Sequence, residues 1–260
     1  MTTGSIITAA MFALLAAAHS AAGESGFVKP LINAEWSITE LPRPLANRLL
    51  RGAWHLTSVA WLAMATIAVG GTPLAAIAVA ALVSGVVILV VGPGHPAWPL
   101  FMIAGGAGLY TENLLGDTLL RIGGGLTIAA VIASAGLHVY WAAGGNALRD
   151  AVVPTAGDSG DQTFSPGPLS TLAVAGLLIG FAGLLTITVG DLGPASWDPP
   201  IVRWLIIAGI VVLALRAVGD GRYAGFSKKH RSSKFGRMDD LYYTPLVVGI
   251  AMGAAGVLLI

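Results

Sequence analysis

Eight apolar stretches constrain what this chain can fold into more than any other feature of its sequence. They cover roughly residues 5–22, 50–70, 73–92, 97–113, 122–143, 169–189, 201–218 and 242–260. About 20 mostly apolar residues in an α-helix are enough to cross the hydrocarbon core of a bilayer. The sequence therefore predicts an all-α, polytopic integral membrane protein with about eight transmembrane helices.

Composition agrees with a lipid environment. Hydrophobic residues make up 55% of the chain and charged residues only 10%, whereas soluble domains carry roughly 25% charged residues. The net charge of +1 gives no reason to expect nucleic acid as a partner. Because the chain contains no cysteine, disulfides, thiolate metal ligands and cysteine nucleophiles are excluded.

Lysine and arginine are distributed unevenly over the predicted loops. Of the 14 Lys and Arg residues, all but Arg121 and Arg203 fall on one side of the predicted membrane. Short loops rich in Lys and Arg stay in the cytoplasm. We therefore expect a bacterial cytoplasmic (inner) membrane protein with both termini outside. We also expect the first helix to be retained, because residues 1–10 lack the basic segment of a secretory signal.

The two halves of the chain share features at their helix ends. The first predicted helix ends in "AHSAAGE" and the fifth in "LHVYWAAGG", so that a histidine precedes a small-residue exit in both. The fourth and eighth helices begin with an aromatic residue and a proline, which the first helical turn tolerates. This internal repeat predicts two tandem four-helix units, residues 1–116 and 117–260, in parallel orientation.

Histidines gather on the basic side of this topology. Neutral imidazole binds copper, zinc, iron and haem iron, and a nearby carboxylate can add a ligand or fix the imidazole tautomer. A histidine and a carboxylate can also pass protons to a quinone or a lipid substrate. The candidate cofactor-binding or metal-binding residues are His19, Glu24, His55, His95 and His138, with haem or a transition metal as the candidate cofactor.

The alternative interpretation of these histidines is structural. Side chains near a membrane interface often anchor a helix by hydrogen bonds, and neither an HExxH nor a CxxCH motif occurs in the chain. His19 and Glu24 are five residues apart, which separates them by about 140° on an ideal helix. Only a break in the helix near Gly23 would bring the two side chains together.

A basic run, "RYAGFSKKHRSSKFGR", lies between the seventh and eighth predicted helices. Such a cluster is attracted to anionic head groups of the inner leaflet. The candidate head-group contacts are Arg216, Lys228, Lys229, Arg231, Lys234 and Arg237. For Arg216, pairing with Asp220 on the same helical face is a second possibility. The alternative interpretation of the run is that it only sets the topology.

Two segments of the second half, "LHVYWAAGG" and "LRAVGDGRYAGFSKKHRSSKFGRMDDLYYTPL", carry a family resemblance. They resemble the bacterial membrane family known as domain of unknown function 3995, although Thr244 stands where the family has serine and Leu241 where it has a basic residue. The resemblance covers residues 130–257 and implies a four-helix membrane unit without an assigned activity. The first half is similar to uncharacterised small four-helix membrane proteins.

Three functions are compatible with these observations. We favour a non-catalytic accessory or structural subunit of a membrane complex, with membrane lipids and other membrane-protein subunits as partners, because no catalytic motif is present. The alternative is a membrane-embedded redox or lipid-modifying enzyme that uses the histidine layer. A small-molecule transporter ranks last, because such proteins carry polar residues near the bilayer midplane and this chain has almost none there.

Overall fold

A computed structural model describes residues 1–34, 42–154, 166–190 and 199–260 of the chain. Within these ranges the chain is helical and has no strand, which confirms the all-α prediction. The chain divides into two compact units, Met1–Leu115 (unit 1) and Gly116–Ile260 (unit 2).

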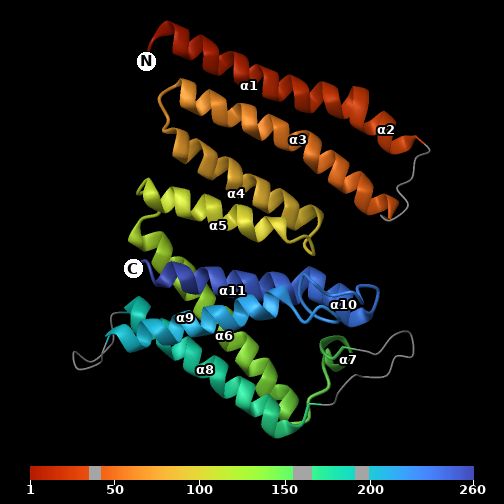
Figure 1. Cartoon of the computed structure of the whole chain (residues 1–260), viewed down its shortest axis with the longest axis vertical. Helices are drawn as coiled ribbons and strands as arrows, with labels where there is room; N and C mark the ends of the chain where they lie inside the picture. The colour runs from red at the N-terminus through yellow and green to blue at the C-terminus, as the bar shows by residue number, and fades with distance from the viewer. Residues whose placement is uncertain (35–41, 155–165, 191–198) are drawn as a thin grey trace. The chain divides into compact units, whose positions relative to one another are not determined.

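Unit 1 is an open row of helices. Its elements are α1 (Thr3–Gly23), the π-helix η1 (Glu24–Val28), α2 (Lys29–Asn33), α3 (Arg43–Ala68), α4 (Pro73–Val91) and α5 (Ala97–Thr111). Helix α1 packs on α3, α3 on α4, and α4 on α5 (Figure 1). The starts of α1 and α4 are capped by Thr2 and Thr72, whose hydroxyls accept hydrogen bonds from backbone N–H groups three residues on.

Unit 2 is a closed bundle. Its elements are α6 (Asp117–Ala142), α7 (Arg149–Val152), α8 (Pro168–Gly190), α9 (Pro199–Val218), α10 (Lys234–Met238), the π-helix η3 (Asp239–Tyr243) and α11 (Thr244–Val257). Helix α6 packs on α8 and α11, and α9 packs on α11 and α8. A fully buried core of Leu185, Ile206, Ala254 and Val257 joins α8, α9 and α11, and Ile128 of α6 packs against it.

The two units differ in how their first and last helices meet. The contact between α6 and α11 closes unit 2, whereas in the described part of unit 1 no contact of similar extent joins α1 to α5. In both units each long helix packs on the next one along the chain, but the helices form a ring in unit 2 and a row in unit 1. The internal duplication therefore stays a prediction.

Among the described residues, six helical segments are long and apolar enough to cross a membrane. They are Thr3–Asn33, Pro73–Val91, Asp117–Ala142, Pro168–Gly190, Pro200–Val218 and Lys234–Val257. A polytopic membrane protein is supported, but eight spans are not confirmed. Arg48, Arg51 and His55 make α3 more polar than the other long helices, and α5 has only 15 residues, fewer than the roughly 20 that a span needs.

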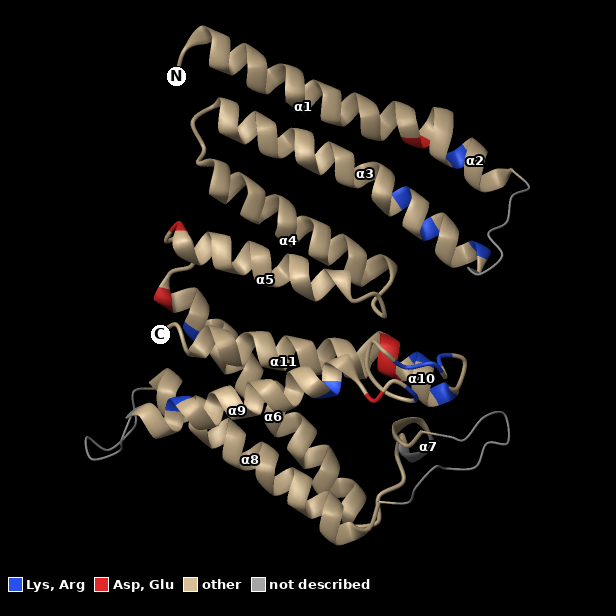
Figure 2. Cartoon of the chain, viewed as in Figure 1, with Lys and Arg blue, Asp and Glu red and all other residues tan. Residues whose placement is uncertain are grey.

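The outer surfaces of both units are apolar. Leu14 on α1 is 63% exposed, Val90 on α4 is 73% exposed and Leu177 on α8 is 75% exposed. Lysine and arginine gather on α2 and the first half of α3 in unit 1, and around α10 in unit 2 (Figure 2). Large exposed apolar surfaces are unfavourable in water, so this distribution fits helices surrounded by lipid.

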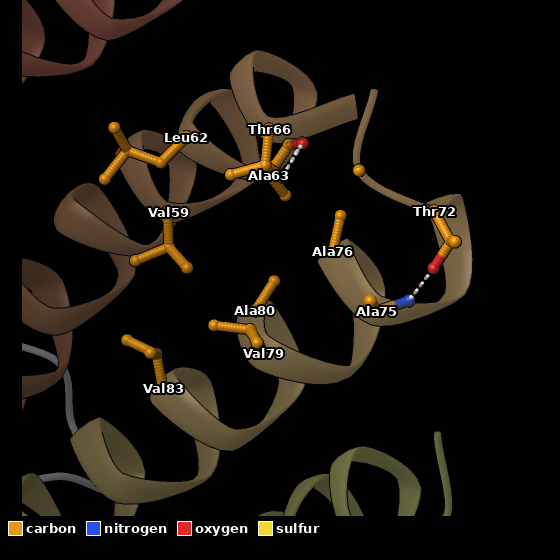
Figure 3. A pocket seen from close by; sticks show the side chains of 11 residues that line it. Val59, Leu62, Ala63, Thr66, Thr72, Ala75, Ala76, Val79, Ala80 and Val83 are labelled. Atoms are coloured by element: carbon orange, nitrogen blue, oxygen red, sulfur yellow. Dashed lines mark hydrogen bonds between the residues drawn. The ribbon is translucent and has the colours of Figure 1, made fainter. Parts of the chain in front are cut away.

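A groove of about 270 Å³ lies between α3 and α4. Val59, Leu62, Val79 and Val83 line it together with alanines from both helices, as Figure 3 shows. The hydroxyl of Thr66, which also lines the groove, donates to the carbonyl of Ala63, 2.7 Å away. The lining therefore offers apolar contact to lipid chains and little polar chemistry.

Candidate functional site

The polar contacts of unit 1 concentrate where the end of α1 meets the first half of α3. The π-helix η1 begins at Glu24, directly after Gly23, and supplies the break in the helix that the sequence required. Its wider turn lets Glu24 face α3, which His19 and Ser20 also contact. We call the side chains that join here the α1–α3 polar cluster: His19, Ser20, Glu24, Arg51, Trp54, His55, Thr57 and Ser58.

His19 is held by aromatic stacking and hydrogen bonds. Its ring lies on Trp54, with centroids 4.3 Å apart and planes 4° apart, and meets the edge of Trp61 at 4.8 Å. Thr57 donates its hydroxyl proton to the carbonyl of Trp54 at 2.7 Å, so Nε2 of His19, 2.7 Å from that hydroxyl, must donate. Trp54 in turn donates to the carbonyl of His19 at 3.1 Å.

His55 joins a second chain of contacts. Its Nε2 lies 3.4 Å from a carboxylate oxygen of Glu24, and its Nδ1 lies 3.0 Å from the hydroxyl of Ser20. That hydroxyl is 2.9 Å from the hydroxyl of Ser58. On the other side Arg51 binds Glu24, with contacts of 2.8 Å and 3.2 Å. The chain therefore runs Arg51, Glu24, His55, Ser20, Ser58.

The order Glu24–His55–Ser20 resembles that of a catalytic triad, in which a carboxylate orients a histidine that activates a serine. Acyl transfer also needs free N–H donors to stabilise the oxyanion. Ser20 lies inside α1, where backbone N–H groups are bonded along the helix. The arrangement therefore suits the docking of one helix on another better than nucleophilic catalysis.

The other predicted ligands make separate local contacts. His95 accepts a hydrogen bond from the N–H of Ala97 at 3.2 Å, within its own turn. His138 belongs to unit 2, where Nδ1 lies 2.8 Å from the carbonyl of Ser134, one turn earlier in α6. Within the described ranges no group of three or more His, Cys, Asp or Glu side chains is arranged to hold a metal ion.

In unit 2 a buried carboxylate is the centre of the polar contacts. Asp239, fully buried at the start of η3, accepts four hydrogen bonds. The guanidinium of Arg216 is 2.6 Å away, and the Lys228 amine, the Gly225 N–H and the Thr244 hydroxyl are each 2.9 Å away. These residues form the Asp239 network. It pins the segment after α9 to the start of α11.

A second carboxylate extends this network. Asp240 accepts from the amine of Lys228 and, at 2.8 Å, from Arg231. Arg231 also donates to the carbonyl of Phe226. Since the side chain of Lys228 is completely buried, its charge is used inside unit 2. The head-group contact predicted for Lys228 is therefore replaced by an internal ion pair.

Arg216 and Asp220 do not pair with each other, contrary to one of the sequence expectations. Arg216 turns to Asp239, and its Nη1 is buried without a hydrogen-bond partner among the described residues. The carboxylate of Asp220 accepts from the N–H groups of Arg222, Tyr223 and Ala224, at 2.7 to 2.9 Å. Slight burial raises the pKa of Asp220, but these three N–H groups lower it by more, so the carboxylate stays charged.

The segment that carries these contacts also carries the family resemblance. Residues 131–254 match the family of proteins of unknown function DUF3995. The DUF3995 match confirms the resemblance of the second half and includes every member of the Asp239 network. No curated protein and no solved structure matches the chain significantly.

Sequence reasoning named Glu24 beside the histidines but missed their other partners, Ser20, Trp54 and Thr57. Arg51, His55 and Ser58 follow one another at steps of four and three residues, the spacing of one helix face. Ser20 at the end of α1 and Glu24 at the start of η1 are also four residues apart. Polar faces on two consecutive membrane helices were the signal from which these partners could have been predicted. Such faces indicate that the two helices contact each other rather than a ligand.

Gly23 is expected to be essential for the docking of α1 on α3. A Cβ atom there would lie 2.1 Å from Nε1 of Trp54, whereas a Cβ at Gly26, three residues on, meets nothing within 4 Å. Gly23→Ala should therefore cost about 1–3 kcal/mol by overpacking, reduced by its better helix propensity.

The Gly26→Ala variant is the matched control and should keep or slightly raise the thermal unfolding midpoint in detergent. Equal midpoints for Gly23→Ala and Gly26→Ala would contradict the close packing of α1 on Trp54.

Proposed function

We propose that this protein is a non-catalytic accessory or structural subunit of a membrane complex. The observation that supports this proposal most directly is that the polar side chains of unit 1 contact one another between helices. Three of the candidates for chemistry, His19, Glu24 and His55, make their contacts where α1 and η1 meet α3. Their hydrogen bonds hold α1 on α3. In a bilayer such bonds matter because there is no hydrophobic driving force for helices to associate.

The open row of unit 1 supports a subunit role. Ala16 is the one fully buried residue of α1, and Met11 and Leu14 on the same helix are 59% and 63% exposed. Among the described residues of unit 1, helix α1 packs chiefly on α3, and its only other extensive contact is with the adjoining η1. A membrane helix with so little packing inside its own unit leaves a wide face for another subunit.

Photo-crosslinking in intact membranes tests the subunit role. A photoreactive amino acid at Met11 or Leu14 should give one discrete heavier adduct with another protein. The matched control is the same amino acid at Ala16, which faces the chain's own interior and should give no such adduct. Lipid adducts alone at Met11 and Leu14 would contradict the subunit role.

We further propose that α3 and α5 also cross the membrane, which gives eight spans. In a bacterial cytoplasmic membrane both termini would then lie on the side away from the cytoplasm. The unequal distribution of Lys and Arg supports this orientation. Because the chain has no cysteine, single cysteines report on each side. A membrane-impermeant maleimide should label Ile260→Cys in intact cells and leave Ser232→Cys unlabelled, and the reverse pattern would refute the orientation.

A further inference from the structure

We propose that residues 219–238, which we call the basic cap, form a docking surface for the phosphate head groups of anionic phospholipids. The cap joins α9 to η3 and α11, and both sides of it continue into membrane-length helices. It therefore stands where these helices leave the hydrocarbon region. Head-group phosphates are present at this depth on all sides.

The cap presents positive charge outward because the carboxylates of the described residues around it are used inward. Residues 216–240 contain seven Lys and Arg residues against three Asp residues. Asp239 and Asp240 bind Arg216, Lys228 and Arg231, and Asp220 binds backbone N–H groups. Further positively charged side chains of the cap that are exposed include Arg222, Lys229 and Arg237.

These cations are carried by an ordered backbone. The N–H groups of Phe226 and Ser227 donate to the last carbonyls of α9, at 2.8 Å and 3.0 Å. Gly219 and Gly225 have positive φ, and a Cβ on either would strike backbone atoms of the other's segment. Because the turn is fixed by these contacts, binding a head group costs less conformational entropy than it would on a loose loop.

Apolar side chains flank the cap on its membrane side. Val218, the last residue of α9, is 59% exposed, and Leu241 and Tyr242 in η3 are 53% and 59% exposed. A phospholipid has a phosphate, which the cations can bind, and acyl chains, which the exposed apolar side chains can contact. This juxtaposition favours a membrane lipid over a soluble anion.

Binding of fluorescent phosphatidylglycerol and phosphatidylcholine with identical tails tests the proposal. The full chain, delipidated in neutral detergent, should bind phosphatidylglycerol more tightly by fluorescence anisotropy. Each cation near a phosphate is worth about fivefold in affinity. The Lys229→Gln/Arg237→Gln double variant should therefore weaken phosphatidylglycerol binding by about 25-fold, while phosphatidylcholine binding stays the same.

The control is the Lys29→Gln/Arg48→Gln double variant, which removes two exposed cations from unit 1 and should keep the wild-type affinity. Equal weakening in both doubles would mean general charge attraction and would overturn the site. Two wild-type measurements do not depend on any variant. Raising NaCl from about 0.1 M to about 1 M should weaken phosphatidylglycerol binding, and soluble glycerol phosphate should not displace the lipid. Failure of either would overturn the proposal.

Discussion

Replacing Asp239 by asparagine should lower the stability of unit 2 by about 3–5 kcal/mol, the usual cost of removing one partner from a buried ion pair. Asp239 and Lys228 have side chains with no exposure at all, so the amine of Lys228 and the guanidinium of Arg216 would be left facing a neutral amide. For a unit of this size the thermal unfolding midpoint should fall by roughly 6–20 °C. Circular dichroism of the purified chain in detergent measures it.

Two further variants show whether charge is the cause. Asp240→Asn should have a smaller effect, because the side chain of Asp240 is 20% exposed and Asp239 still neutralises Lys228. Adding Lys228→Met to Asp239→Asn should recover part of the loss, since a buried pair replaced on both sides by neutral groups costs little. A wild-type midpoint for Asp239→Asn would show that the network does not stabilise unit 2.

Replacing Trp54 by alanine should destabilise unit 1 by about 3 kcal/mol, the low end for a large aromatic residue because Trp54 is only half-buried. Its ring stacks on His19 and, at 4.8 Å, on Phe27, and its Nε1 donates to α1. The variant removes all three contacts at once. The expected result is an earlier loss of helical signal on heating.

Trp204→Ala is the matched control for this variant. Trp204 lies on α9 and is 68% exposed, so its removal should change the midpoint little. If both tryptophan variants behave alike, the contact between α1 and α3 does not contribute to stability, and the α1–α3 polar cluster loses its structural role.

The positions of the helices could be predicted from the sequence, whereas their contacts could not. The stretch expected at 73–92 is α4, Pro73–Val91, because a long apolar run between Pro and Gly has one stable form in lipid. The facing of His19 and Glu24 toward α3 depends on the π-helix η1, and "ESGFV" carries no pattern that predicts a π-helix.

The basic run shows a second limit of the sequence. Lys228 and Lys229 are adjacent and identical in type, yet Lys228 is 3% exposed and Lys229 is exposed. The difference arises from Asp239, 11 residues later, which reaches Lys228 only because Gly219 and Gly225 fold the cap back onto α9. Contacts of this kind depend on tertiary geometry and cannot be read from local spacing.

We propose that the predicted histidine layer joins helices instead of binding a cofactor. The most direct test is the metal content and optical spectrum of the full chain, purified in mild detergent without chelators, beside the His19→Ala/His55→Ala double variant. We expect no haem absorption band and no stoichiometric metal in either protein, because Nε2 of His19 and both ring nitrogens of His55 contact protein groups. The variant should also have a lower thermal midpoint. A haem band or a stoichiometric metal in the wild type that the variant loses would contradict the claim.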